Sequence, residues 1–590
     1  MKRQLLLILF MVMLISAYSQ NIFHDIHAVV NIDSQTIEVE DHMTIKKNLY
    51  KDTNEVWFYL GKSFIILNSG EGRAVIEIPS ENPKLRKFSV LIPDTSLDSS
   101  TFTMRYRAKI SGEFLETESD YARGFSETDG IISENGVYLS GSSLWVPFME
   151  DQLFTFKLTT LIEEGYGVVS QGKRTDNDKI NGDQRIVYDC PFPMEEIYLV
   201  AGQWTEFELD QGHVLLQAFL RSDDQALADK YLGVTSSYVK RYESLIGPYP
   251  FTKFILVENF WETGYGMPSF TLLGEKVIRF PWILHSSYPH ELLHNWWGNS
   301  VYVDYETGNW CEGITAYMAD HLNKEIEGSG DIYRRNALQK YTDYVNAEND
   351  FPLADFISRN NSEQQAIGYS KSLMIFHMLR MEYGDDKFIA SWQHFYQNNR
   401  FKSASFDDIR ESFEFVTGDS LKSFFKQWVN RKSAPTLKLE SVRVKTEGDI
   451  ELVIKLNQIQ EEEVFDVSIP IAVYLAGKKE AKIHRLRMTE RTQRFSIACD
   501  SKPLRVEVDP YFDVMRRLDK NEVPATLSRI LGSEDVAIVI PFNGKFVAEY
   551  FDLANEWKKK FTDEGKKVRI IYDRDVTNLP KEKAIWIFGY

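Results

Sequence analysis

The fold of this chain is decided by the stretch Tyr288-Pro289-His290-Glu291-Leu292-Leu293-His294-Asn295-Trp296-Trp297-Gly298. It contains the pattern HExxH. Residues four apart share one face of an α-helix, so His290 and His294 can present two imidazoles to one zinc ion. Glu291 points partly around such a helix and can reach a water at the metal rather than the metal itself. Pro289 suits a first helical turn, where its missing N–H costs little. The stretch therefore predicts a helix that carries a metal site.

A third metal ligand is expected nearby, because a catalytic zinc takes three protein ligands and keeps one position open. The segment Trp310-Cys311-Glu312-Gly313-Ile314-Thr315-Ala316-Tyr317 begins another helical pattern, and Glu312 stands 18 residues beyond His294. Its apolar setting favours a ligand over a solvated surface glutamate. The sequence thus predicts one Zn²⁺ per chain, bound by His290, His294 and Glu312.

The segments before this motif change in character near residue 205. From about Gln20 to Thr205 the pattern alternates as in β-strands, without a convincing helix. The clearest run is Phe102, Met104, Tyr106, Ala108 and Ile110, with shorter runs at Ile37/Val39 and Met43/Ile45. Helical spacing over 223–246, a strand-like run at 254–257 and further helical patterns to about Val429 follow. We expect an N-terminal β domain over 20–205 and a mostly helical domain over 206–433.

The remaining chain predicts two further units after a linker at 431–435. Alternating runs at Leu452/Ile454/Leu456 and at 467–473 are typical of a small β-sandwich over 434–512. Strand patterns at 536–540, 568–571 and 585–587, with an amphipathic helix over 546–561, predict an α/β unit over 513–590. This unit stops on a buried-strand pattern at Tyr590, so we expect it to be incomplete. The fold class is multidomain α+β.

The length and composition exclude several classes of protein. A chain of 590 residues needs several domains, and 43% hydrophobic with 13% aromatic residues is typical of packed globular structure. The net charge of −18, without a block of Lys and Arg, disfavours nucleic acid as a partner. Three cysteines, Cys190, Cys311 and Cys499, imply no disulfide framework and are best explained as small buried hydrophobes.

The N-terminus predicts export. Met1-Lys2-Arg3 precedes an apolar run from Leu5 to Ile15, and small residues at Ala17 and Ser19 suit cleavage before Gln20. We therefore expect a signal peptide over 1–19 and a periplasmic or secreted protein. No later apolar run approaches the roughly 20 residues of a membrane-spanning helix, so no stable span is expected after its removal.

The motifs together resemble the gluzincin aminopeptidases, the family of aminopeptidase N and leukotriene hydrolase. The resemblance is carried by His290 to His294 with Trp296, Gly298 and Asn299, then by Glu312-Gly313, and then by Gly368-Tyr369-Ser370-Lys371. It extends to Pro248-Tyr249-Pro250-Phe251 and to Phe425-Lys426-Gln427-Trp428-Val429, and so covers about residues 200–435.

This resemblance implies a thermolysin-like domain behind an N-terminal β domain. It implies His290, His294 and Glu312 as zinc ligands, Glu291 as the general base and Tyr369 as the hydroxyl that stabilises an oxyanion. A tetrahedral intermediate places negative charge on the carbonyl oxygen, which zinc and a phenol donor can both stabilise. The implied reaction is hydrolysis of peptide substrates, and the oligomeric state is left open.

Two features depart from the family pattern. The spacing between His294 and Glu312 is one residue short, which a loop near 305–308 can absorb. The family also carries Gly-x-Met-Glu-Asn on a strand that lines the cleft, and its Glu binds the α-amine of the substrate. This chain has Gly264-Tyr265-Gly266-Met267-Pro268-Ser269 instead. We expect Gly264, Tyr265, Gly266 and Met267 to contact substrate, but Pro268 cannot bind an ammonium group.

Three interpretations follow from this departure. Another carboxylate, with Glu258 and Glu262 nearby in sequence, can replace the lost glutamate in an aminopeptidase. Alternatively, the enzyme is a zinc peptidase that needs no free N-terminus. The third possibility is a catalytically silent binding protein of the same fold, against which stands the presence of all three ligands, the base and the tyrosine.

Overall fold

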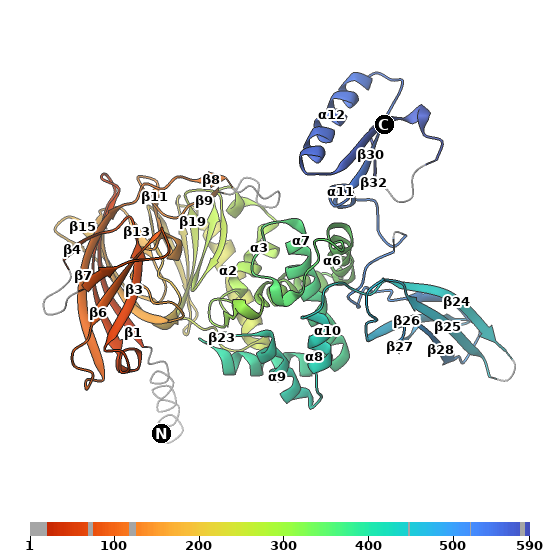
Figure 1. Ribbon diagram of the computed structural model, residues 1–590, viewed down its shortest axis with the longest axis horizontal. Helices are drawn as coiled ribbons and strands as arrows, with labels where there is room; N and C mark the ends of the chain where they lie inside the picture. Colours follow the sequence, from red (N-terminus) through yellow and green to blue (C-terminus); the bar gives the residue numbers. More distant parts are fainter. Residues whose placement is uncertain are drawn as a thin grey trace. The chain divides into compact units, whose positions relative to one another are not determined.

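The computed structural model describes residues 21–68, 75–116, 126–446, 449–519, 521–578 and 584–589 (Figure 1). The predicted signal peptide and Tyr590 lie outside this part of the chain. The chain forms two compact units. The first runs to Tyr302 and includes Tyr396–Ser403, and the second holds Val303–Phe395 and the residues from Ala404 onward. No helix in the described ranges combines the length and apolarity that crossing a membrane requires.

The first unit begins with the β-rich segment that the alternating sequence predicted. Seven strands form one sheet in the order β14-β15-β12-β1-β2-β7-β4, with β1 and β12 parallel and the other neighbours antiparallel. Their bounds are β1 Ile22–Asn31, β2 Thr36–Lys46, β4 Ile65–Asn68, β7 Ser99–Lys109, β12 Phe154–Glu163, β14 Lys173–Ile180 and β15 Asp183–Met194.

Strand β2 spans both of the short alternating runs, Ile37/Val39 and Met43/Ile45. Its inward residues include Asp41, which interrupts the apolar alternation between Val39 and Met43. The Asp41 carboxylate is fully buried and lies 2.7 Å from Nδ1 of His24 on β1. A buried polar group persists in a sheet when a partner satisfies it, so the strand continues through Asp41.

Three smaller sheets complete this segment. β3 (Glu55–Gly61), β6 (Leu85–Leu91) and β5 (Val75–Ile78) form one of them. The second has the order β10-β11-β16-β13, and β8 (Leu115–Glu116) pairs with β9 (Ser126–Glu127) in the third. The four strands of the second sheet are β10 Ile131–Ser133, β11 Gly136–Leu139, β13 Gly167–Val169 and β16 Leu199–Gly202.

The end of the first unit carries a five-stranded mixed sheet in the order β17-β18-β19-β21-β20. Strands β18, β19 and β21 are parallel, while β17 and β20 run antiparallel at the two edges. The bounds are β17 Thr205–Asp210, β18 Leu215–Leu220, β19 Lys253–Asn259, β20 Gly264–Met267 and β21 Phe270–Gly274. Helix α2 (Gln225–Leu245) connects β18 to β19, and the short helix α3 (Ser287–Leu293) follows β21.

The second unit begins with helices, as predicted. These are α4 Cys311–Thr315, α5 Leu322–Ile326, α6 Gly330–Tyr344, α7 Ser362–Gln365, α8 Ser372–Asn399, α9 Phe406–Thr417 and α10 Lys422–Trp428. Two π-helical segments, η7 (Ala316–His321) and η9 (Ala366–Lys371), interrupt the α-helical geometry. The C-terminal residues of α8, from Tyr396 onward, belong to the first unit.

Two antiparallel three-stranded sheets follow, in the orders β24-β25-β28 and β27-β26-β29. Their strands are β24 Leu437–Lys445, β25 Glu451–Gln458, β26 Val467–Leu475, β27 Lys482–Met488, β28 Thr492–Ala498 and β29 Pro503–Val508. The three cysteines of the chain are free, and Cys190 and Cys311 are buried.

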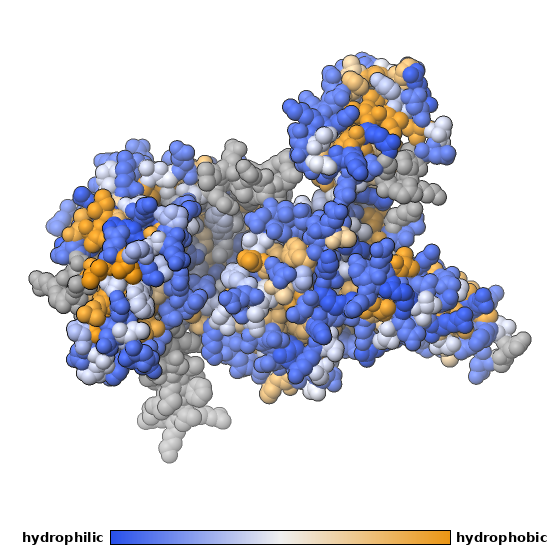
Figure 2. Space-filling model, in the orientation of Figure 1, coloured by the Kyte–Doolittle hydropathy of each residue, from blue (hydrophilic) through white to orange (hydrophobic). Residues whose placement is uncertain are grey.

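The last segment holds a parallel sheet in the order β31-β30-β32, from β30 (Asp535–Ile540), β31 (Lys567–Tyr572) and β32 (Ala584–Ile587). Helix α12 (Val547–Asp563) packs on it through Ala554 and Phe561. Figure 2 shows apolar atoms gathered on the surface of this segment. Ile587 of β32, for example, is 63% exposed, so this small sheet leaves part of its apolar surface in contact with solvent.

Candidate active site

The HExxH stretch forms helix α3, as predicted. The helix ends at Leu293, and His294 caps it by donating its backbone N–H to the carbonyl of His290 at 3.2 Å. The two imidazole centroids are 4.9 Å apart. Leu292 and Leu293 are fully buried, whereas both histidines are only half-buried. The apolar face of the helix therefore fixes its orientation and leaves the two imidazoles side by side on the other face.

A backbone contact orients the second imidazole. Nδ1 of His294 lies 3.1 Å from the backbone carbonyl oxygen of Trp297, which can only accept a hydrogen bond. Nδ1 therefore carries the proton, and Nε2 keeps the lone pair that a metal needs. Metal-ligating histidines commonly make this kind of outer contact, which sets the tautomer and the ring direction.

The structure brings Glu312 together with the two histidines. One ligand atom from each of His290, His294 and Glu312 lies within 4.8 Å of the other two, and all three side chains are half-buried. Two imidazole nitrogens and one carboxylate oxygen are the donor set of catalytic zinc sites with an open fourth position. The three predicted ligands therefore fit a zinc ion by donor type and by mutual distance.

Glu312 and Tyr369 come from helical segments that pack closely in the second unit. A Cβ added to Gly313 would lie 2.0 Å from Oγ of Ser372, so only glycine allows this approach. On α4, Glu312 directly precedes Gly313. Tyr369 lies three residues before Ser372, within the π-helical segment η9. Single π-helical turns are common at functional sites, because they displace one side chain from the regular helical positions.

The ring of Tyr369 contacts two side chains that were not predicted from the sequence. Phe356 contacts it edge-on at a centroid distance of 6.2 Å, and the guanidinium carbon of Arg359 lies 4.9 Å from the ring centroid. A cation over an aromatic ring is attracted to its face, so Arg359 helps to hold the ring in place. Arg359 stands in a loop outside every motif, so no sequence pattern pointed to it.

Strand β20 lies directly against the predicted general base. A Cβ added to Gly266 would be 2.8 Å from Oε2 of Glu291 and 2.9 Å from its backbone oxygen. Gly264, Tyr265 and Gly266 are half-buried, and Met267 is buried in the core of the five-stranded sheet. Three of the four predicted substrate-contacting residues thus retain exposed surface, and Met267 does not.

Pro268 and Ser269 form the turn between β20 and β21, and both are buried. Ser269 has a φ of +70°, which is uncommon for a residue other than glycine. Its backbone N–H donates to Oδ1 of Asn295 at 2.8 Å, and its hydroxyl accepts from Nζ of Lys253 at 2.9 Å. The turn is therefore fixed from two sides and presents no carboxylate.

The two glutamates that the sequence offered as substitutes are committed to other contacts. Glu258 is 1% exposed and forms an ion pair with Arg279, and it also accepts the backbone N–H of Arg221 at 2.8 Å. Glu262 accepts the backbone N–H of Lys276 at 3.0 Å. Both therefore serve local structure.

Several residues that position α3 were not predicted. Tyr231, Tyr238 and Tyr242 lie on one face of α2, and their hydroxyls donate to the backbone carbonyls of Ile278, Leu284 and Pro289. Asn295, fully buried, joins α3 to the hairpin through Ser269 and also donates to the carbonyl of Leu292 at 2.8 Å. The sequence contains one signal for the three tyrosines: they stand at positions i, i+7 and i+11 of the predicted helix over 223–246, which places them on one face.

Comparison with known proteins agrees with this geometry. Residues 285–428 match the model of the Peptidase family M1 domain. Glutamyl aminopeptidase of Sus scrofa is 26% identical over 202 residues, which cover 33% of this chain and 21% of that protein. Alanine/arginine aminopeptidase of Saccharomyces cerevisiae is 18% identical over 559 residues, or 88% of this chain and 64% of that protein. The chain spans less than two thirds of the length of each of these relatives.

Residues 285–428 are thus similar to a peptidase domain, and the relatives that match more of the chain carry the names of aminopeptidases. The similarity is to the aminopeptidases of this family, which the motifs of the sequence also resemble. Residues 285–428 include the HExxH helix, Glu312 and Tyr369, so the match covers all five residues to which the family resemblance assigns a role at the metal.

Proposed function

We propose that this protein is an exported, zinc-dependent aminopeptidase. The observation that carries the proposal is the convergence of His290, His294 and Glu312 within 4.8 Å, with Glu291 on the same helix. The names of the relatives, glutamyl aminopeptidase and alanine/arginine aminopeptidase among them, support the class of substrate. Peptides are accordingly the proposed substrates.

The residues divide the chemistry among them. Zinc, when bound by His290, His294 and Glu312, supplies a Lewis acid that polarises the substrate carbonyl. Glu291 accepts a proton from the attacking water and passes it to the leaving amine. The hydroxyl of Tyr369 donates a hydrogen bond to the oxyanion as its charge develops. Arg359 packs over the ring of Tyr369 and supports its position.

A second candidate is a zinc peptidase that does not require a free N-terminus. It is favoured by the hairpin turn, where Pro268 and Ser269 are buried and carry no carboxylate. Glu258 and Glu262 do not fill that role, because both are held by local contacts. An aminopeptidase of this kind therefore needs a carboxylate from elsewhere in the fold.

One experiment separates these candidates. A matched peptide series with free and acetylated N-termini is incubated with wild type and with Glu291→Gln, and the products are read by mass spectrometry. An aminopeptidase cleaves only the free peptides, and the second candidate cleaves both forms. Glu291→Gln should bind zinc but cleave neither form, because it removes the base without removing a ligand. Zinc binding without any cleavage by wild type would instead support a silent binding protein.

Export has its own test. The apolar run at 5–15 and the small residues at Ala17 and Ser19 support cleavage before Gln20. Full-length protein expressed in a bacterial host should lie outside the cytoplasm, and its N-terminal residue should be Gln20. Recovery of the intact Met1 form in the cytoplasm would contradict the proposal. The same preparation should contain one zinc per chain by elemental analysis.

A further inference from the structure

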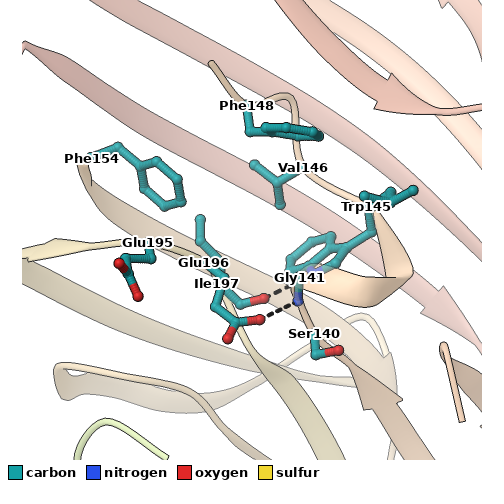
Figure 3. A pocket seen from close by; sticks show the side chains of 10 residues that line it. Ser140, Gly141, Trp145, Val146, Phe148, Phe154, Glu195, Glu196 and Ile197 are labelled. Atoms are coloured by element: carbon teal, nitrogen blue, oxygen red, sulfur yellow. Dashed lines mark hydrogen bonds between the residues drawn. The ribbon is translucent and has the colours of Figure 1, made fainter. Parts of the chain in front are cut away.

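A pocket of about 240 Å³ lies in the β-rich segment of the first unit (Figure 3). Its lining is mostly apolar and includes the aromatic side chains of Trp145, Phe148 and Phe154, with Ile197 between them. Trp145 is fixed by its indole N–H, which donates to the carbonyl of Ile197 at 2.9 Å. Its volume is below the 300–1,000 Å³ of sites for whole drug-sized ligands, so it suits one side-chain-sized group.

Two adjacent carboxylates interrupt this apolar lining. Glu196 is fully engaged, since it accepts hydrogen bonds from the backbone N–H of Gly141 and from the hydroxyl of Tyr198. A Cβ added to Gly141 would lie 2.5 Å from Oε2 of Glu196, so glycine is required for the carboxylate to reach this position. The carboxylate of Glu196 is thus held in place at the pocket.

Glu195 is different. Its side chain lines the same pocket beside Phe154, and it has no hydrogen-bond or ion-pair partner among the described residues. The apolar surroundings and the neighbouring Glu196 raise the pKa of Glu195 to about 7. An ionised Glu195 therefore lacks a compensating positive charge, which a ligand can supply.

The chemistry of the pocket favours an organic cation over a metal ion. Ca²⁺ takes six to eight oxygen ligands, and the pocket offers only two carboxylates in an apolar wall. Among the described residues, the group with the donors for a metal is His290, His294 and Glu312. Aromatic faces beside a carboxylate instead suit an ammonium or guanidinium group on an apolar stem.

Tyr198 connects one carboxylate of the pocket to the hairpin that faces Glu291. Tyr198, which donates to Glu196, packs edge-on against Phe270 of β21 at a centroid distance of 5.7 Å. Tyr198, Phe270 and Met267 belong to one buried cluster. One side chain thus separates the carboxylate of Glu196 from the β20–β21 hairpin.

We propose that this pocket binds a lysine or arginine side chain of the peptide substrate, with Glu195 as its ionic partner and the aromatic side chains around its apolar stem. This specificity rests on the proposed peptidase function. The site itself is independent of turnover, so binding and cleavage can be measured separately.

The binding test uses the full-length Glu291→Gln variant, which prevents hydrolysis of the probe. Nα-acetyl-lysine methylamide and its neutral analogue Nα-acetyl-norleucine methylamide are titrated by calorimetry. The lysine probe should bind about tenfold to a hundredfold more tightly, as expected for a hydrogen bond to a charged group. Adding Glu195→Gln should abolish this difference, and Glu208→Gln, the same change at an exposed position of β17, should preserve it. Equal binding of the two probes to the Glu291→Gln parent would overturn the proposal.

The kinetic test uses wild type and a peptide set in which lysine or norleucine is scanned through each position. At one position lysine should raise kcat/KM about tenfold over norleucine, and Glu195→Gln should remove this preference without changing cleavage of the norleucine peptide more than twofold. A lysine preference that survives Glu195→Gln would refute the assignment. If wild type cleaves no peptide, the peptidase proposal fails, and the calorimetric comparison still decides whether the pocket binds the cation.

Discussion

Replacing Gly266 by alanine tests whether the β20 strand sets the position of the general base. The added Cβ would lie 2.8 Å from Oε2 of Glu291, 2.9 Å from its backbone oxygen and 3.2 Å from its Cα. A side-chain oxygen can rotate away, but the backbone oxygen and Cα move only with the helix. Because Glu291 stands between His290 and His294 on α3, the displacement reaches the base and the ligands together.

The size of the effect follows from these distances. An ordinary contact begins at 3.4 Å, so the backbone oxygen of Glu291 must retreat by about 0.5 Å. A misplacement of 1 Å can cost roughly a hundredfold in rate, so we expect Gly266→Ala to lower kcat/KM about tenfold. Overpacking of this kind should also destabilise the protein by roughly 1–3 kcal/mol.

Gly264→Ala is the matched control on the same strand, because its added Cβ would meet only Cδ2 of Leu273, at 4.0 Å. Both variants are compared with wild type by kcat/KM on a cleaved peptide, by Tm and by zinc content. Gly264→Ala should stay within twofold of wild type, and its Tm should be unchanged or slightly raised. If Gly266→Ala behaves like Gly264→Ala, the strand does not position Glu291.

Three further outcomes follow from other contacts. Tyr369→Phe should lower kcat by about 10²–10³ with unchanged zinc content, as for loss of an oxyanion donor; a loss below fivefold would point to another stabiliser. Asn295→Ala leaves the buried N–H of Ser269 without its acceptor and should lower the unfolding free energy by about 2–4 kcal/mol in urea titrations, while an unchanged midpoint would exclude Asn295 as the link between hairpin and helix. Burial lowers the pKa of Lys253 from 10.5 to about 7. The unfolded chain therefore binds this proton between pH 7 and 10 while the folded chain does not, and wild type should gain stability relative to Lys253→Met as the pH rises from 7 to 9. A pH-independent difference in Tm between the two proteins would contradict this.

The sequence predicted those parts of the site that depend on local spacing. His290 and His294 are four residues apart, and any helix through them places both imidazoles on one face. The strand and helix patterns of the C-terminal α/β segment likewise agree with β30, α12, β31 and β32 within a few residues. In each case the periodicity of apolar residues was enough, because the face that is buried follows directly from it.

Residues that act across the fold could not be found in this way. Arg359 contacts Tyr369 from a loop, and the hydroxyl groups of Tyr231, Tyr238 and Tyr242 bind backbone carbonyls more than 40 residues away. Such contacts depend on how elements pack and leave no pattern in neighbouring residues. Asp41 shows the converse, since a polar residue that interrupted an apolar pattern is paired through Oδ2 with His24 on the adjacent strand.

The departure from the family pattern at Pro268 depends both on the local sequence and on contacts across the fold. The sequence showed that the amine-binding glutamate is missing, and the structure shows why one substitution would not restore it. Pro268 is buried beside Ser269, whose backbone and hydroxyl are held by Asn295 and Lys253. A glutamate at this turn would place its charge in a buried site and disturb the contact between the hairpin and α3. An aminopeptidase with this hairpin therefore needs a carboxylate from outside it to bind the α-ammonium group of its substrate.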